Sequence, residues 1–95
     1  YHQNEPLVKT AYAICRWHHE RYDGSGYPDG LKGEEIPYLS RVLTLVDSFD
    51  AILSDRPYKK GRTFEEGIVE LVRCRGTQFD PALTDRFIEA LRTVR

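Results

Sequence analysis

The stretch YLSRVLTLVDSFDAILS, residues 38–54, predicts the central helix of the fold. Its apolar residues recur at three- and four-residue steps on more than one face, a pattern typical of a helix buried at the centre of a domain. Asp47 and Asp50 interrupt this pattern and lie on nearly the same helix face. Because an unpaired buried carboxylate is strongly unfavourable, we expect each of them to have a partner.

Three further helices are expected around the central one. Pro6 suits a first helical turn and opens a helix that runs to about His19. Residues 63–66, Thr-Phe-Glu-Glu, have the form of a capping box, and Asp80-Pro81 is a typical N-cap followed by a first helical residue. No alternating pattern predicts a strand. The sequence therefore predicts an all-α fold, a bundle of about four helices in one domain.

A long loop joins the first two predicted helices. Residues 21–37 carry four glycines and two prolines and show no periodicity, and loops of this length in compact domains are usually functional. The adjacent His18 and His19 place two imidazoles where this loop begins. Imidazole suits Fe, Zn and related metals and carboxylate suits harder cations, so these histidines together with Asp47 point to Fe, Mn or Zn.

Composition narrows the function classes. The chain has 95 residues, of which 40% are hydrophobic and 31% charged, so it is too apolar for a disordered segment. Its net charge of -1 provides no general field for polyanions, so phosphate recognition would need a local cluster. Cys15 and Cys74 stand alone, which gives no zinc motif or disulfide framework and favours a reducing compartment.

The ends of the chain and its apolar segments lead to two expectations. No signal peptide and no apolar run of membrane length are found, so we expect a cytoplasmic protein. The chain lacks an initiator methionine, so we expect a piece of a longer protein.

Taken together, the motifs resemble the signature of the HD-GYP domain, a bacterial branch of the HD phosphohydrolase superfamily. The resemblance begins with His18-His19-Glu20 and with the run DGSGYP at residues 23–28. It continues, in the family's order and spacing, through residues 30–37, 41–47, 50–51, 56–59 and 76–81. The resemblance implies an all-α, HD-like helical bundle, of which residues 1–95 would form the C-terminal part.

The resemblance also implies a function. HD-GYP domains hydrolyse the bacterial messenger cyclic di-GMP with a cluster of two or three Fe or Mn ions. The residues that it implies are the metal ligands and catalytic residues His18, His19 and Asp47, and the substrate-binding residues Tyr27, Pro28, Arg56 and Lys59. Tyr27 would lie beside a base or ribose, and Arg56 and Lys59 would contact phosphate. The expected partners are a GGDEF cyclase domain at residues 26–28 and a fused sensor or receiver domain, with no DNA.

The upstream His-Asp pair that gives the family part of its name is not found in this chain. His2 is the remaining histidine, and its spacing from His18 does not match the family's. The implied ligands thus make about half of a metal site, so we expect little or no catalysis by the 95 residues alone. Two alternatives stay open: a module of a metal-dependent phosphodiesterase, or a non-catalytic relative that binds nucleotide or a cyclase.

Three residue roles also stay open at this point. Arg56 and Lys59 either contact phosphate or belong to an ordinary solvated basic patch. Asp50 either orients a metal ligand or pairs with Arg56. Glu20 either supports a ligand or simply ends the first helix.

Overall fold

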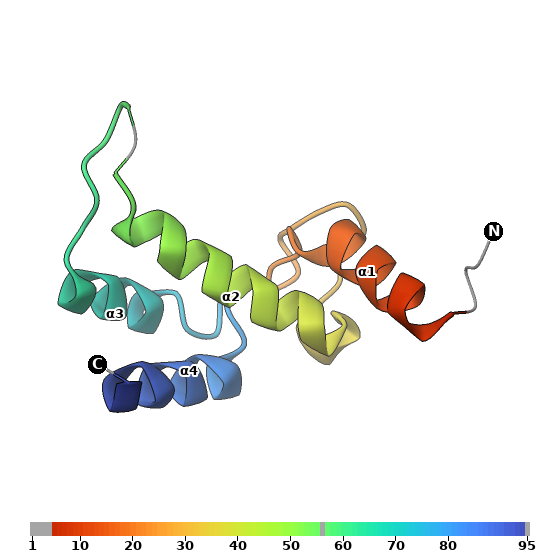
Figure 1. The fold of residues 1–95 in the computed structure, drawn as a ribbon. Helices are drawn as coiled ribbons and strands as arrows, with labels where there is room; N and C mark the ends of the chain where they lie inside the picture. The colour runs from red at the N-terminus through yellow and green to blue at the C-terminus, as the bar shows by residue number, and fades with distance from the viewer. Residues whose placement is uncertain (1–4, 56, 95) are drawn as a thin grey trace.

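The computed structural model describes residues 5–55 and 57–94, and in these residues it confirms the all-α prediction (Figure 1). Its helices are α1 (Pro6–Trp17), the short 3-10 helix η1 (Gly33–Glu35), α2 (Tyr38–Leu53), α3 (Phe64–Arg73) and α4 (Pro81–Val94). Helix α1 ends at Trp17, slightly before the end predicted at about His19, because His18 already forms the C-cap. No helix in the described part of the chain is long and apolar enough to cross a bilayer.

Helix α2 is the long central element to which the other helices attach (Figure 1). Helix α1 packs near its N-terminal end, while α3 and α4 pack against each other and against its other half. The chain between α2 and α3 extends away from the helices as an arm, drawn in green in Figure 1. This arrangement leaves the end of α1 and the loop that follows it beside the middle of α2.

The hydrophobic core lies where α2, α3 and α4 meet. Its buried members are Leu45, Phe49, Ile68, Leu71, Cys74 and Phe79. The Phe49 ring makes edge-to-face contacts with Phe64 and Phe87 at centroid distances of 5.8 and 5.7 Å, a geometry worth about 0.5–1.5 kcal/mol per pair beyond area burial. Gly67 lets α3 approach this ring, because a Cβ there would lie 2.7 Å from Phe49 Cε1. The core therefore fixes α2 relative to the last two helices.

The predicted helix starts are confirmed at α3 and α4. Thr63 Oγ1 accepts a hydrogen bond from Glu66 N at 3.2 Å, and Glu66 Oε1 accepts one from Thr63 N at 2.8 Å. Asp80 Oδ1 accepts from Leu83 N at 3.1 Å at the start of α4. These caps satisfy amide groups that a helix end leaves without an internal partner.

A buried ion pair joins the loop, α2 and α4. Arg41 Nη1 donates to Asp80 Oδ2 at 2.6 Å, and its Nε donates to the Ile36 carbonyl oxygen at 2.9 Å. The two charged side chains are only 14% and 7% exposed. Buried charges of this kind are tolerated when each is paired and hydrogen-bonded. Arg41 therefore ties both the end of the long loop and the start of α4 to α2.

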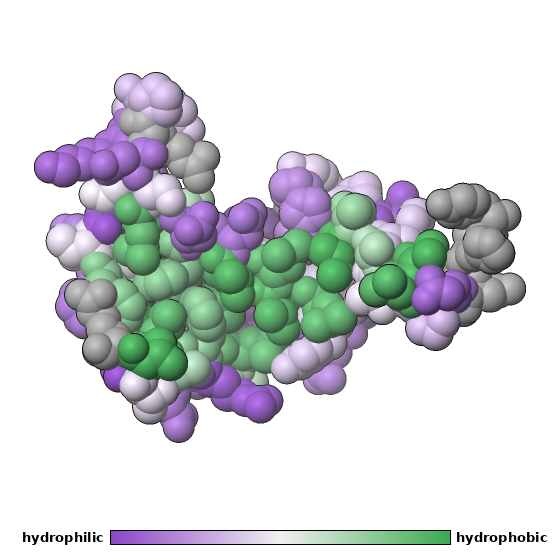
Figure 2. All heavy atoms as spheres, viewed as in Figure 1, coloured by the Kyte–Doolittle hydropathy of each residue, from purple (hydrophilic) through white to green (hydrophobic). Residues whose placement is uncertain are grey.

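Two expectations about α2 are wrong. The buried residues of this helix are Ser40, Leu45 and Phe49, whereas Leu39 and Val46 are 46% and 42% exposed. Figure 2 shows the corresponding apolar band along α2 in that view. The other helices cover only part of the α2 surface, so an apolar pattern all round did not mean burial all round. Asp47 and Asp50 are likewise exposed, so water solvates them and neither requires a buried partner.

Candidate functional site

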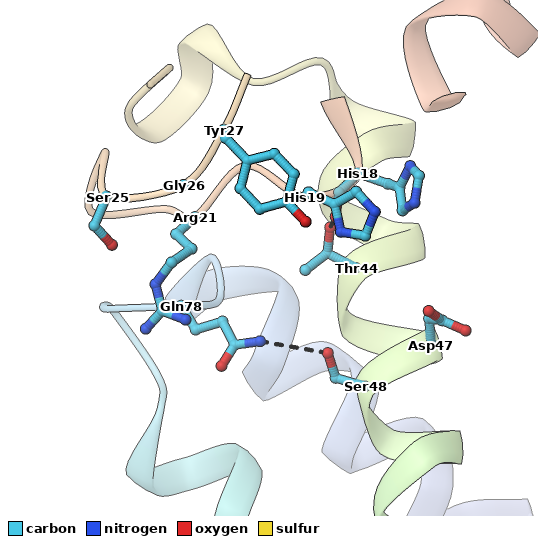
Figure 3. A pocket seen from close by; sticks show the side chains of 10 residues that line it. All are labelled: His18, His19, Arg21, Ser25, Gly26, Tyr27, Thr44, Asp47, Ser48 and Gln78. Atoms are coloured by element: carbon cyan, nitrogen blue, oxygen red, sulfur yellow. Dashed lines mark hydrogen bonds between the residues drawn. The ribbon is translucent and has the colours of Figure 1, made fainter. Parts of the chain in front are cut away.

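A pocket of about 290 Å³ opens between the end of α1, the loop after it, and the middle of α2 (Figure 3). Four residues that the sequence singled out line it: His18, His19, Tyr27 and Asp47. The histidines and the tyrosine lie on one side, and Asp47 extends from α2 below them (Figure 3). The structure therefore brings most of the predicted site residues into one cavity.

The His18 ring is oriented by the end of its own helix. Its Nδ1 lies 2.8 Å from the Ile14 carbonyl oxygen and 3.2 Å from that of Cys15. Carbonyl oxygens only accept hydrogen bonds, so Nδ1 carries the proton and, in the neutral ring, Nε2 has a lone pair. This tautomer is the one that metal-binding histidines with a backbone partner adopt.

Two hydroxyl groups of α2 fix the end of α1. Thr44 Oγ1 lies 2.5 Å from the His18 carbonyl oxygen, and Ser40 Oγ donates to the Ala13 carbonyl oxygen at 2.9 Å. Ser40 is fully buried. Small hydroxyl side chains at these two α2 positions allow the two helices to come close, and Thr44 supplies a partner for the carbonyl of the C-cap residue His18. They therefore set where the two histidines stand relative to α2.

The His19 and Tyr27 rings stack on each other at the wall of the pocket. Their ring planes are 15° apart with centroids separated by 5.0 Å, and the His18 and His19 centroids are 3.9 Å apart. Tyr27 is 62% exposed, so much of its ring stays open to a ligand. The open part of the Tyr27 ring can stack against a nucleobase.

The long loop is held from inside by a buried carboxylate. Glu20 is 2% exposed, and it accepts hydrogen bonds from Asp29 N at 2.7 Å and from Leu31 N at 2.8 Å. Asp29 in turn accepts from Arg16 Nη2 at 2.9 Å and from Trp17 Nε1 at 2.6 Å. The hydrogen bonds from Arg16, and to a lesser extent the one from Trp17, hold the pKa of the Asp29 carboxyl below its usual value. Glu20 thus anchors the loop, a role other than the two predicted for it, and its support of a metal ligand stays a prediction.

We expect Gly26→Ala to destabilise the chain by about 1–3 kcal/mol, the usual range for overpacking. A Cβ at Gly26 would lie 2.5 Å from the His19 carbonyl oxygen and 2.7 Å from Glu20 Cα, and it would also meet Arg21 N. These are backbone atoms, which cannot rotate away as a side chain can. Denaturant unfolding of the variant measures the effect.

Gly33→Ala is the matched control for this change. An added Cβ at Gly33 meets nothing within 4 Å, although the residue has a left-handed φ of 59°. Gly33→Ala should therefore lower stability only through backbone strain, by about 1–2 kcal/mol. Chemical shifts of His19 and Tyr27 should move only in Gly26→Ala. Unchanged shifts in that variant would show that the loop does not depend on the close approach.

The three predicted metal ligands share the pocket without closing around a point. In Figure 3 the Asp47 carboxylate lies one helical turn beyond Thr44, apart from the two rings. Within residues 5–55 and 57–94, no three His, Cys, Asp or Glu side chains are grouped so that they could hold a metal. The donor chemistry fits Fe, Mn or Zn, but the arrangement is not a complete ligand set. Metal binding by His18, His19 and Asp47 stays a prediction.

The other predicted substrate residues lie outside this pocket or outside the described residues. Pro28 is exposed and adjoins Tyr27, but it is not part of the pocket wall. Lys59 is exposed on the arm between α2 and α3 (Figure 1). Arg56 falls outside the described residues. Phosphate binding by Arg56 and Lys59 therefore stays a prediction, and so does the basic-patch alternative.

Sequence reasoning missed several polar residues of the pocket wall. They are Arg21, Ser25, Thr44, Ser48 and Gln78. Arg21 lies two residues after His19, so its motif position was a usable signal. Gln78 lies in the matched run of residues 76–81, which was also a usable signal, although it enters the pocket from the connection between α3 and α4, far from the histidines in sequence. The backbone carbonyl oxygen of Gln78 accepts a hydrogen bond from Tyr22 N at 3.1 Å, and the backbone carbonyl oxygen of Thr77 accepts one from Asp23 N at 2.8 Å.

Known proteins similar to this chain are cyclic dinucleotide phosphodiesterases. The family described as "HD domain" matches residues 3–83. The cyclic di-GMP phosphodiesterase response regulator RpfG of Xanthomonas campestris is 52% identical over 82 residues, which are 86% of this chain and 22% of that protein. The cyclic di-GMP phosphodiesterase of Thermotoga maritima is 41% identical over 86 residues, 90% of this chain and 23% of that one.

A solved structure shows the same fold. The crystal structure of a cyclic GMP-AMP specific phosphodiesterase from Vibrio cholerae superimposes with a TM-score of 0.72 at 28% identity. The match covers 84% of this chain and 19% of that one. The chain therefore spans about a fifth of the length of the proteins that it matches.

Proposed function

This chain belongs to the HD domain family, in its HD-GYP branch, and we propose that it is the C-terminal part of a phosphodiesterase domain that hydrolyses cyclic di-GMP. The observation that carries the proposal is the single pocket that His18, His19, Asp47 and Tyr27 line together. It combines the side chains that a divalent metal prefers with an aromatic surface for a base. The proposed setting is cytoplasmic signalling in bacteria.

Each residue has a separate task in this proposal. Two or three Fe or Mn ions, when bound, would supply an activated hydroxide and stabilise negative charge on the phosphoryl oxygens. His18 would contribute Nε2, because its Nδ1–H is held by the Ile14 carbonyl. His19 and Asp47 would contribute the other donors. Tyr27 would hold a base or ribose, and Pro28, Arg56 and Lys59 would add contacts to the substrate.

The pocket supports only part of such a metal centre. The described residues hold no group of three donors around one point, so further ligands must come from residues beyond these. The relatives are four to five times longer than the matched segment, which leaves room for such ligands in their chains. We therefore propose that the 95 residues alone bind metal weakly and do not turn over substrate.

A non-catalytic module that binds nucleotide or a cyclase is the second candidate. The lack of a group of three donors within residues 5–55 and 57–94 is compatible with it. The exposed Tyr27 ring is compatible with both candidates, because an open aromatic residue suits a docking surface as well as a base. Under this alternative, residues 26–28 would contact a GGDEF cyclase domain. A fused sensor or receiver domain is proposed under both alternatives.

The deciding experiment is a hydrolysis assay of the longer protein that contains this chain. We expect cyclic di-GMP to be linearised in the presence of Mn or Fe and to remain intact when the metal is chelated. Metal analysis of the purified protein shows whether ions are bound. Binding of cyclic di-GMP without hydrolysis under either metal would favour the non-catalytic module.

A further inference from the structure

Three polar side chains converge at the end of the pocket beneath Tyr27. Arg21 comes from the long loop, Ser48 from α2, and Gln78 from the connection between α3 and α4. In Figure 3, Arg21 and Gln78 extend toward the same space, and a hydrogen bond joins Gln78 to Ser48. In that view Arg21 and Gln78 lie apart from the His18 ring and the Asp47 carboxylate, while Ser48 follows Asp47 on α2 with its hydroxyl directed toward Gln78. The metal chemistry proposed above uses none of the three.

These side chains retain most of their hydrogen-bonding capacity. The contact of Gln78 Nε2 with Ser48 Oγ is long, at 3.5 Å. Arg21 Nε is 3.9 Å from Asp23 Oδ1, and that oxygen already accepts from Ser25 N at 2.9 Å and Ser25 Oγ at 2.6 Å. The Arg21 side chain is 39% exposed. A ligand can therefore engage its guanidinium without breaking a strong internal ion pair.

The mixture of donors and acceptors favours a base over a phosphate. Ionised phosphate oxygens only accept hydrogen bonds. The side-chain carbonyl oxygen of Gln78 is also an acceptor, so it would repel a phosphate. A nucleobase edge offers both kinds of group, and the stacked His19 and Tyr27 rings supply a face for it. The planar fork of Arg21 matches guanine, which presents O6 and N7 as two acceptors, whereas adenine presents one acceptor and one donor.

We propose that Arg21, Gln78 and Ser48 form a subsite that reads the edge of one guanine base, with Arg21 selecting guanine over adenine. This inference rests on the proposed function, because it takes a cyclic dinucleotide as the ligand. A pocket of about 290 Å³ is at the small end for ligand sites and suits one nucleotide unit. The other half of the dinucleotide then lies outside this pocket.

The test compares two cyclic dinucleotides that differ only in their bases. Binding of cyclic di-GMP and cyclic di-AMP to the 95-residue chain is followed by NMR titration with a chelator present. We expect Arg21→Gln to weaken cyclic di-GMP about tenfold and to change cyclic di-AMP by less than about twofold, since a bidentate Arg–guanine contact discriminates at that level. We expect Gln78→Leu to reduce the same preference.

Arg86→Gln is the matched control, because it removes the same charge from an exposed position on α4 outside this pocket. It should leave both affinities unchanged. Circular dichroism and thermal melting test whether Arg21→Gln is folded, which we expect because its internal contact is weak. A binding change in a folded variant then reports on the ligand.

Several results would overturn the subsite. Equal weakening of both dinucleotides by Arg21→Gln would assign Arg21 to a phosphate. The subsite would also be rejected if Arg21→Gln left binding unchanged. The same holds if the wild-type chain showed no preference between the two dinucleotides or bound neither. The hydrolysis assay of the longer protein decides the proposed function separately, so the enzyme can be confirmed while this subsite is rejected.

Discussion

Replacing His18 by asparagine should lower metal-dependent hydrolysis of cyclic di-GMP by the longer protein about 100-fold or more. Even the outer partners of metal ligands are worth about 10–100-fold, and a direct ligand should exceed that. Asparagine is chosen because its side-chain amide can replace Nδ1–H as the donor to the Ile14 carbonyl. The substitution therefore removes Nε2 while keeping the helix end intact.

Two measurements accompany this prediction. Metal content of the purified protein should fall with activity, and thermal melting should show an unchanged fold. Glu34→Ala serves as the control, since Glu34 is exposed on η1 and does not line the pocket. Asp47→Asn should resemble His18→Asn if both residues ligate metal. Full activity in either variant would remove the metal-binding role from that residue.

Replacing Glu20 by alanine should cost about 2–6 kcal/mol of unfolding free energy. The substitution removes the carboxylate that accepts from the part-buried amides of Asp29 and Leu31, and the loss of each such hydrogen bond costs about 1–3 kcal/mol. A small domain has only about 5–15 kcal/mol in total, so a large part of the stability would be lost. Urea unfolding followed by circular dichroism measures the change.

Glu20→Gln separates shape from hydrogen bonding. The glutamine amide keeps one accepting oxygen in place of two, so we expect a loss of unfolding free energy smaller than that of Glu20→Ala. Glu34→Ala, from an exposed position of the same loop, should change stability by less than about 0.5 kcal/mol. If Glu20→Gln matched the wild type, the carboxylate would not be the group that fixes the loop.

The helices were predictable because their signals are local. Capping at Thr63 and Asp80 and the proline at the start of α1 act within a few residues, and the structure confirms all three. The burial of α2 was not predictable in the same way. Its apolar pattern shows which faces suit burial, but only the other helices decide which faces are covered, and Leu39 and Val46 remain open.

The same distinction applies to the site. The adjacent histidines and the Gly-Tyr-Pro run lie in one continuous motif, so their shared location with Tyr27 followed from the sequence. Gln78 reaches the pocket only because backbone groups of residues 77–78 pair with residues 22–23. That pairing bridges segments far apart in the chain, and no local pattern encodes it. Asp47 was placed correctly at the pocket, but its exposure was not foreseen.

The anchoring of the long loop by Glu20 and Asp29 affects how selectivity can change. A loop that becomes ordered only on binding loses about 1–2 kcal/mol of conformational entropy for each backbone residue that it fixes. Here the backbone at Asp29 and Leu31 is already held by Glu20, and Asp29 is tied to α1. Substitutions at solvent-facing pocket positions such as Ser25 can therefore alter ligand preference while the scaffold keeps its shape. A rigid backbone with replaceable side chains is well suited to divergence between related ligands.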